Sequence, residues 1–367
     1  MKKTSKSYQL FFEGDDYYSA LRRDIASASR CVLMESYIFE DDEIGLEIIE
    51  SLIAAARRGV LVRIIADGVG SYSLHQDAIR RMRAEKIELS IFRPLGWFGM
   101  LSIRNHRRSH RKLVVIDGNI CYAGGMNIVR DHSRRAVGHE SWRDSMIRLV
   151  GRIAMDAELS FDRMWRFVSG RKLVFPRSRP AGVVYSSADL QLIENTPRFR
   201  LAFRRAYRDS LASAQNRIWI ESAYFIPTLS FLRLLKRKAR AGVDVRLLVS
   251  EKSDVKAAFY ASRFVFSGLL KAGVRIYEVR ARFVHSKALV VDDRISIVGS
   301  ANLDHRSFLH DLELSIRSTR PDINHDLAHQ FSVDASRARL IDGVEWGKRP
   351  FTVRLLERWF FLFKFYL

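Results

Sequence analysis

The sequence is poor in cysteine and has no long apolar run. Its two cysteines, Cys31 and Cys121, each lie in an apolar stretch that reads as a strand. We therefore expect buried free thiols rather than a disulfide, which favours a reducing compartment. No run of about 18 uninterrupted apolar residues occurs, so the sequence predicts no membrane-spanning helix. The basic start of the chain also has no apolar segment of the length that a signal peptide needs.

Acidic side chains are scarce relative to basic ones. The chain has 41 Asp and Glu against 62 Lys and Arg, which gives a formal net charge of +21 at pH 7. Such an excess attracts polyanions, so nucleic acid and an anionic membrane surface are both candidate partners. The charge alone does not choose between them. A length of 367 residues exceeds the usual size of one domain, so we expect two lobes.

One motif occurs twice, and the rest of the chain repeats around it. Both copies have His, Lys two residues later, Asp five after that, Gly seven further on and Asn three beyond. A single copy would be a weak signal, whereas two copies that share the Gly and the Asn are specific. The matched pairs are His110 and His285, Lys112 and Lys287, Asp117 and Asp292, Gly124 and Gly299, and Asn127 and Asn302.

The segments around the motif predict an α/β fold. Residues 31–39 read as a buried strand, an amphipathic helix follows and stops at Gly59, and residues 61–66 read as the next strand. Such a β-α-β unit favours parallel strands covered by helices. The same order returns in the second half, where Gly242 matches Gly59. We therefore expect a fused duplication: two homologous α-β-α lobes with mixed sheets, related by a pseudo-twofold axis.

The composition also predicts where the lobes begin and end. Pro, Gly and Ser accumulate shortly after the expected end of the first lobe, and aromatic residues gather at the end of the chain. The predicted units are an N-terminal lobe (1–170), a linker (171–189), a C-terminal lobe (190–340) and an amphipathic aromatic tail (341–367).

Three apolar segments each allow two interpretations. Residues 94–101, which include Trp97, are either a buried loop or a loop that enters a lipid interface. Residues 255–271 form either a core helix or a wall that faces lipid. The tail at 351–367 is too short and too charged to span a bilayer, so it either lies on a membrane or packs on the body of the protein.

The motif residues suit chemistry on a phosphate. Side chains alternate along a strand, so the His and Lys of each motif share one face and the Asp points to the other. Lysine and asparagine donors suit the charge that develops on phosphate oxygens. One imidazole can attack phosphorus while the other protonates the leaving oxygen, which requires the two motifs to meet. By this argument Asp117 and Asp292 are structural.

A histidine nucleophile also needs a carboxylate that orients its ring. Aligning the segments downstream of the two motifs places Asp144 and Glu313 at equivalent strand starts, so these are the orienting candidates. We expect no metal centre, because the motifs lack clustered carboxylates. His325 and His329 lie four residues apart on a predicted helix, and we expect a solvated helix face there.

These residues resemble the twin motifs of the phospholipase D superfamily. Within it, the chain is similar to bacterial cardiolipin synthases, especially the short, cardiolipin synthase B type, from about residue 10 to about residue 332. The second motif departs from the first at Ser300, which stands opposite Gly125. Further matching segments are Asp67-Gly-Val-Gly-Ser71, Phe98-Gly-Met100, Ala223-Tyr-Phe-Ile-Pro227 and Val298-Gly-Ser-Ala-Asn-Leu-Asp304.

The resemblance implies a phosphatidyltransferase that works through a phosphohistidine without a metal or other cofactor. By analogy His110 is the nucleophile and His285 the acid and base, although near-symmetry allows the roles to be exchanged. The implied substrate is phosphatidylglycerol, and the product is cardiolipin. The implied catalytic residues are His110, Lys112, Asp117, His285, Lys287 and Asp292, and the implied phosphate contacts are Asn127, Asn302 and Ser300.

The resemblance also implies a peripheral protein on the cytoplasmic face of a bacterial inner membrane, with anionic phospholipids as partners. Three other functions stay open at the level of the sequence. A hydrolase would use water as the acceptor, and a nuclease would use the same phosphohistidine on DNA, although the aromatic tail disfavours nucleic acid. A lipid-binding scaffold would need no catalysis. The sequence makes no prediction about oligomeric state.

Overall fold

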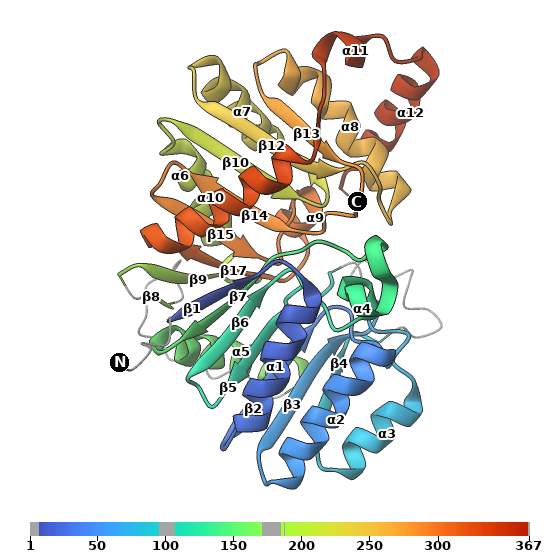
Figure 1. Cartoon of the computed structure of the whole chain (residues 1–367), viewed down its shortest axis with the longest axis vertical. Coiled ribbons are helices and arrows are strands. Elements are labelled where there is room, and N and C mark those ends of the chain that lie inside the picture. Colours follow the sequence, from blue (N-terminus) through green and yellow to red (C-terminus); the bar gives the residue numbers. More distant parts are fainter. Residues whose placement is uncertain (1–6, 95–106, 171–184, 187, 366–367) are drawn as a thin grey trace.

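The chain folds into two lobes stacked along its long axis (Figure 1). The computed structural model describes residues 7–94, 107–170, 185–186 and 188–365. The predicted loop around Trp97 and most of the predicted linker lie outside these residues. Within the described residues, the N-terminal half forms one lobe and the C-terminal half forms the other.

The N-terminal lobe is built on a seven-stranded sheet of order β1-β7-β6-β5-β2-β3-β4. Strands β2, β3 and β4 are parallel, and every other pairing is antiparallel, so the sheet is mixed as expected. The strands are β1 (Tyr8–Phe11), β2 (Cys31–Ser36), β3 (Leu61–Asp67), β4 (Glu88–Phe92), β5 (Leu113–Ile116), β6 (Ile120–Gly124) and β7 (Met146–Val150).

Helices cover both faces of this sheet. Alternate residues of β2 face opposite sides: Val32 and Met34 pack with α1, α2 and α3, whereas Cys31 and Leu33 pack with α5. Asp42 caps α2 by accepting from the N–H groups of Ile44 and Gly45 at 3.0 and 2.8 Å. The helices are α1 (Gly14–Ser27), α2 (Glu43–Arg57), α3 (Gln76–Ala84) and α5 (Arg152–Val168).

The C-terminal lobe contains a nine-stranded sheet of order β18-β13-β12-β10-β14-β15-β17-β9-β8. Strands β10, β12 and β13 are parallel, and the other pairings are antiparallel. The strands are β8 (Tyr185–Ser186), β9 (Leu190–Asn195), β10 (Arg217–Ser222), β12 (Asp244–Ser250), β13 (Arg275–Val279), β14 (Lys287–Val291), β15 (Ile295–Gly299), β17 (Glu313–Ser318) and β18 (Arg339–Leu340).

One face of the second sheet packs on helices α6, α7 and α8, and the other face packs on α10. Apolar residues of α10, α5 and both sheets form one continuous core between the lobes. A separate two-stranded sheet joins β11 to β16. The remaining C-terminal elements are α6 (Arg200–Ala212), β11 (Phe225–Ile226), α7 (Leu229–Arg240), α8 (Lys256–Leu270), β16 (Leu303–Asp304), α9 (His305–Leu309), α10 (Pro321–Ser336), α11 (Gly343–Gly347) and α12 (Phe351–Leu362).

The duplication is visible in the strand order. Reading β1-β7-β6-β5-β2-β3-β4 against β9-β17-β15-β14-β10-β12-β13 matches every strand and every pairing direction. This confirms the predicted fold class of two related α/β lobes with mixed sheets. The predicted linker differs in one respect, because it contains β8, which pairs with β9 and extends the second sheet.

Several smaller expectations have an answer in the structure. Cys31 and Cys121 are buried free thiols. His325 and His329 are exposed on α10, as expected for a solvated face. No helix among the described residues is long and apolar enough to cross a membrane. Helix α8 buries residues such as Val265 and Phe266, and α12 packs along it.

Candidate active site

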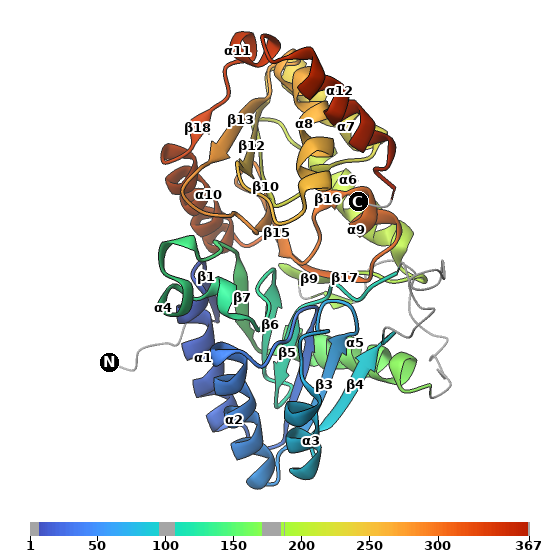
Figure 2. The same cartoon turned by 90° about the vertical axis from the view of Figure 1, so that its right-hand side faces the viewer.

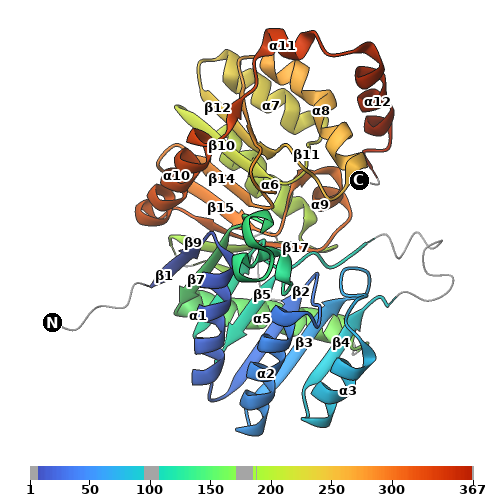
Figure 3. The same ribbon diagram turned by 45° about the vertical axis from the view of Figure 1, so that its right-hand side comes forward.

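The two motifs occupy equivalent places in the two sheets. Lys112 stands directly before β5 and Lys287 begins β14, and each histidine lies two residues earlier. Strands β5 and β14 lie near the middle of their sheets. Strand β5 lies between β6 and β2, and β14 lies between the equivalent strands β15 and β10. Each motif histidine therefore lies just before the first residue of a central strand of its lobe, and Figure 3 shows that the two lobes meet.

Backbone hydrogen bonds connect the lobes at this point. The His110 N–H donates to the carbonyl of Leu312 at 2.9 Å, and the His285 N–H donates to the carbonyl of Arg143 at 2.8 Å. Short parallel bridges pair Ser109 with Leu312 and Arg143 with Val284. Each motif histidine is thus tied to the segment just before the orienting carboxylate of the other half.

The side chains follow the same crossed pattern. Nδ1 of His285 lies 2.6 Å from Oδ2 of Asp144, and Nδ1 of His110 lies 3.2 Å from Oε1 of Glu313. Both carboxylates are fully buried. The sequence alignment identifies these two carboxylates as candidates, and the structure pairs each with the histidine of the opposite lobe. Because Nδ1 is engaged in both rings, Nε2 is left for chemistry.

Burial and positive charge set the protonation of this group. Burial lowers the pKa of His110, and the charges of Lys112 and Lys287 lower it further. Burial and the charges of both lysines and His110 likewise hold the pKa of His285 well below its usual value. Burial raises the pKa of Glu313, but the charges of His110 and Lys112 outweigh this effect and lower it. Both imidazoles are therefore neutral at pH 7.

The two motif lysines are buried without a carboxylate hydrogen bond. Nζ of Lys112 donates to the carbonyl of His110 at 2.9 Å, and Lys287 makes the same contact with His285. Burial lowers the pKa of Lys112 to about 7, and the charge of Lys287 adds to the shift. Burial also lowers the pKa of Lys287 to about 8. An anion placed between the lysines would stabilise their charged forms.

The motif aspartates serve the backbone. Oδ1 of Asp117 accepts from the N–H groups of Arg30 and Cys31 at 2.7 and 2.9 Å, and Oδ1 of Asp292 accepts from those of Asn216 and Arg217 at 2.8 and 2.9 Å. They hold the start of β2 and β10 and contact neither histidine in these bonds. The structural interpretation agrees with this geometry, and the catalytic role implied by the family resemblance does not.

The two motif asparagines are almost completely buried. Oδ1 of Asn127 accepts from the N–H of Ile38 at 3.1 Å, which leaves its Nδ2 without a partner among the described residues. Oδ1 of Asn302 also has no hydrogen-bond partner in the described part of the chain. The Asn127 amide is therefore a donor that suits a phosphate oxygen, as the sequence predicts for this position.

Ser300 has a different partner from the one predicted. Its hydroxyl donates to Glu313 and accepts from the N–H of Leu314 at 3.0 Å, so it supports the carboxylate that contacts His110. These contacts assign Ser300 to the orientation of Glu313 and not to the expected phosphate. At the equivalent place Gly125 makes room, since a Cβ there would collide with the Asp144 carboxylate.

Three aromatic neighbours of the histidines were not singled out from the sequence. The Tyr37 ring lies 4.9 Å from that of His110, and the rings of Trp142 and His132 lie 5.0 and 5.7 Å from that of His285. His132 had a detectable signal, because it lies 175 residues before Ser307, the separation of the two motifs. Its Nε2 accepts from the Asn127 N–H, as the Ser307 hydroxyl does from the Asn302 N–H.

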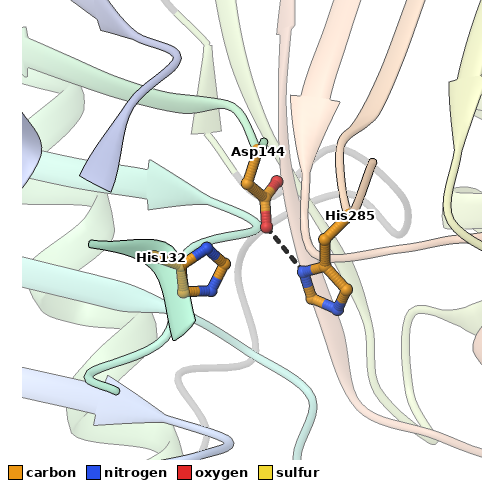
Figure 4. Close-up of side chains that lie close together, drawn as sticks. All are labelled: His132, Asp144 and His285. Carbon is orange, nitrogen blue, oxygen red and sulfur yellow. Dashed lines mark hydrogen bonds and ion pairs between the residues drawn. The ribbon is translucent and has the colours of Figure 1, made fainter. Parts of the chain in front are cut away.

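His132, Asp144 and His285 lie close enough to be considered as metal ligands (Figure 4). Their contacts favour another arrangement. Nδ1 of His285 is already bonded to Asp144, and Nε2 of His132 already accepts a backbone N–H, which places the His132 proton on Nδ1. Burial lowers the pKa of His132 to about 3, so the ring is neutral. Of the three side chains, His285 and Asp144 are hydrogen-bonded to each other, whereas Nδ1 of His132 has no partner among the described residues.

The fold matches solved structures along nearly the whole chain. A phosphatidylserine synthase from Haemophilus influenzae Rd KW20 superposes with a TM-score of 0.73 at 14% identity, covering 99% of this chain and 96% of that one. A polyphosphate kinase from Porphyromonas gingivalis gives a TM-score of 0.60 at 14% identity, covering 89% and 50%. These likenesses show the class of fold: two related α/β lobes stacked on each other, here with one copy of the motif in each.

Sequence comparison narrows the class. The family described as "Cardiolipin synthase, PLD-like domain" matches residues 21–165 and 207–335. A cardiolipin synthase from Geobacillus kaustophilus is 35% identical over 347 residues, which cover 94% of this chain and 69% of that protein. Cardiolipin synthase 2 from Bacillus cereus is also 35% identical, over 94% and 67%. The chain belongs to the cardiolipin synthase family, which confirms the predicted resemblance and enzyme class.

Proposed function

We propose that the protein transfers a phosphatidyl group from one phosphatidylglycerol to the free hydroxyl of another, making cardiolipin and releasing glycerol. The observation that carries the proposal is the crossed pair of buried histidines, each with Nδ1 on a carboxylate of the other lobe. A phosphodiester between the rings would meet an imidazole on each side, His110 as the nucleophile and His285 as the acid. The relatives named cardiolipin synthase support the choice of substrate and product.

In the first step, Nε2 of His110 attacks phosphorus and the bond from phosphorus to the glycerol oxygen breaks. His285 gives its Nε2 proton to that oxygen, so glycerol leaves neutral. In the second step, His285 takes the proton of the acceptor hydroxyl, whose oxygen attacks phosphorus as the bond to His110 breaks. Lys112, Lys287 and Asn127 stabilise the phosphate oxygens through both steps.

The acid step requires a protonated His285, whose pKa is lowered by burial and by the charges of Lys287 and Lys112. A phosphodiester carries one negative charge, and its binding offsets the field of Lys112 and Lys287. Substrate binding therefore favours the protonated imidazole, which Asp144 at 2.6 Å stabilises. In this account the site becomes competent as an acid when the substrate is bound.

We further propose that the protein works at the surface of an anionic bilayer, on the cytoplasmic face of a bacterial inner membrane. The net charge of +21 supports this location, because basic residues near an anionic surface gain about 1 kcal/mol each. Phosphatidylglycerol and cardiolipin are both anionic, so substrate and surface share the same charge.

The test is a transfer assay with the purified protein and vesicles that contain phosphatidylglycerol labelled in its phosphate. We expect labelled cardiolipin and free glycerol in equal amounts, and quenching in denaturant at alkaline pH, where a phosphohistidine bond survives, should trap labelled protein. His110→Ala should yield neither product nor labelled protein. Phosphatidic acid as the main product would identify a hydrolase, and cleavage of single-stranded DNA that depends on His110 would identify a nuclease; either result would replace the proposal.

A further inference from the structure

Helix α12 is held on the C-terminal lobe by one face. The ring of Phe360 stacks on Tyr260 at 5.6 Å, and the ring of Phe361 stacks on Phe264 at 4.5 Å, so aromatic pairs connect it to α8. Glu357, the one acidic residue of α12, is buried and paired with Arg349. These contacts fix the orientation of the helix, and thus decide which side chains point outward.

The outward face of α12 is a stripe of large apolar side chains. Phe351, Leu355, Trp359 and Leu362 are 74, 55, 57 and 64% exposed, and their spacing of four, four and three residues puts them on one side of the helix. Phe363, just after the helix, is 43% exposed. A soluble surface seldom leaves such a row uncovered, and Trp and Phe on an amphipathic helix suit the headgroup boundary of a bilayer.

The charges around this stripe have one sign. Arg354 and Arg358 are exposed beside it, whereas the carboxylate of Glu357 faces inward. A surface that combines exposed aromatics with arginine and turns its acidic group away complements negatively charged lipid headgroups. This complementarity favours an anionic bilayer over a second protein as the partner.

The stripe leads toward the active site. After α12 the ring of Phe365 packs 5.0 Å from that of His305, in the helix α9 that follows the strand after Asn302. Helix α6, with the exposed Arg205 and Arg208, also contacts α9. Figure 2 shows α12 running down the C-terminal lobe from α11 toward α9. An aromatic and a basic segment thus flank the same short helix beside the motif.

We infer that the outward face of α12, defined as Phe351, Leu355, Trp359, Leu362 and Phe363, is the surface by which the protein docks on an anionic bilayer. The inference rests on the proposed lipid substrate and specifies how that substrate is reached. Docking on this face places the end of α12 at the lipid surface, next to the segment that carries Asn302. The lipid then enters from the membrane without crossing water.

The test measures binding of the full-length protein to vesicles by sedimentation, with phosphatidylglycerol and phosphatidylcholine mixed in equal parts. We expect Leu355→Ser/Trp359→Ser to weaken binding at least about tenfold, because two large apolar side chains no longer enter the interface. The matched control is Met155→Ser/Leu159→Ser, which removes an exposed apolar pair of the same spacing from α5, where the residues are 60 and 45% exposed. Control binding should equal that of the wild type.

A second measurement separates this inference from the proposed function. Transfer is assayed on short-chain phosphatidylglycerol below its micelle concentration, where no surface exists. The α12 variant should keep its monomer rate within about twofold while its rate on vesicles falls in step with binding. Equal vesicle binding by variant and wild type would overturn the docking surface alone. A wild type inactive on both substrates would overturn the proposed function, and a wild-type dimer that the α12 variant loses would assign this face to a second copy.

Discussion

The two halves of the protein share a fold and differ in how they support their histidines. In one pair, Asp144 lies 2.6 Å from His285, accepts the Ser145 N–H at 2.7 Å and is packed against Gly125. In the other, Glu313 lies 3.2 Å from His110 and also accepts the Ser300 hydroxyl. The first pair is shorter than the second, and its second hydrogen bond comes from the backbone instead of a side chain. The duplication therefore repeats the scaffold while the proton chemistry of the two histidines has diverged.

The difference extends to the neighbours of the motif asparagines. His132 and Ser307 hold the backbone N–H of Asn127 and Asn302 in the same way. Only the first half uses an imidazole there, and that imidazole reaches the ring of His285 in the other half. One lobe thus supplies two groups, Asp144 and His132, to the histidine that we propose as the acid and base.

The largest expected effect comes from the histidines. His110→Ala and His285→Ala should each lower turnover on phosphatidylglycerol by at least about 10³-fold, because each removes one complete catalytic function. They should differ in trapping experiments: with a substrate whose leaving group needs no protonation, His285→Ala should still form labelled protein and His110→Ala should not. The opposite result would exchange the two roles while keeping the site.

The second largest effect on turnover is expected from Asp144 and Glu313, the carboxylates that contact the histidine of the opposite lobe. Asp144→Asn should lower turnover about 100-fold and Glu313→Gln about tenfold, because Asp144 makes the shorter bond to its histidine. Rates measured with both variants at equal fold stability check the order. Equal losses would mean that the asymmetry of the two pairs has no catalytic consequence.

The pKa values of the two motif lysines predict how kcat/KM changes at alkaline pH. With a pKa of about 7, Lys112 loses its charge as the pH rises through that value, and Lys287 follows near 8. Because the phosphate needs the cationic forms, kcat/KM should fall with rising pH, starting near 7. Lys112→Arg retains the charge and should move this limb to higher pH, whereas Ser286→Ala, beside Lys287, should not. An unchanged limb in Lys112→Arg would contradict the assignment.

A smaller effect is expected from exchanging the residues that differ between the halves. His132→Ser gives the first half the residue of the second, and we expect turnover to fall about fivefold to tenfold through a misplaced Asp144 and Asn127. Ser307→Ala is the counterpart, and it removes only a hydroxyl that holds Asn302. If the pH profile of His132→Ser has the wild-type shape at a lower rate, His132 has a purely structural role.

The smallest effect on turnover belongs to the motif aspartates. Asp117→Ala removes the acceptor of three backbone N–H groups and should lower the free energy of unfolding by about 1 to 3 kcal/mol, and Asp292→Ala should behave alike. Thermal unfolding measures the loss, and kcat of the folded fraction should stay near that of the wild type. A large loss of kcat without destabilisation would restore the catalytic role that the family resemblance implies.

Much of this comparison could be predicted from the sequence, because spacing and alternation are local properties. The twin motifs, the β-α-β order of elements and the candidate carboxylates Asp144 and Glu313 all follow from local sequence patterns. The crossing does not, since it depends on which edges of two similar sheets face each other. The contact of Ser300 with Glu313 could not be predicted for the same reason, because Glu313 is thirteen residues away, on β17.

His132 shows a different limit. It lies in a short 3-10 helix, η3 (Arg130–His132), outside the strands whose alternation is readable. In the sequence, only the equivalence of its position to that of Ser307 in the other half indicates a role for His132. The two side chains differ chemically, although both accept a hydrogen bond here. A pattern search finds positions that stay alike after duplication, and it passes over those at which the copies have specialised.

The backbone hydrogen bonds of His110 with Leu312 and of His285 with Arg143 run from one lobe to the other. Catalytic activity should therefore report whether the two lobes are correctly packed together. If the lobes separate by even a small angle, both rings lose their carboxylates together, before either sheet melts. Inactivation on mild heating or in dilute denaturant should then precede the loss of helical signal. Either half of the chain alone, even if folded, would hold a motif histidine that has no carboxylate to orient it.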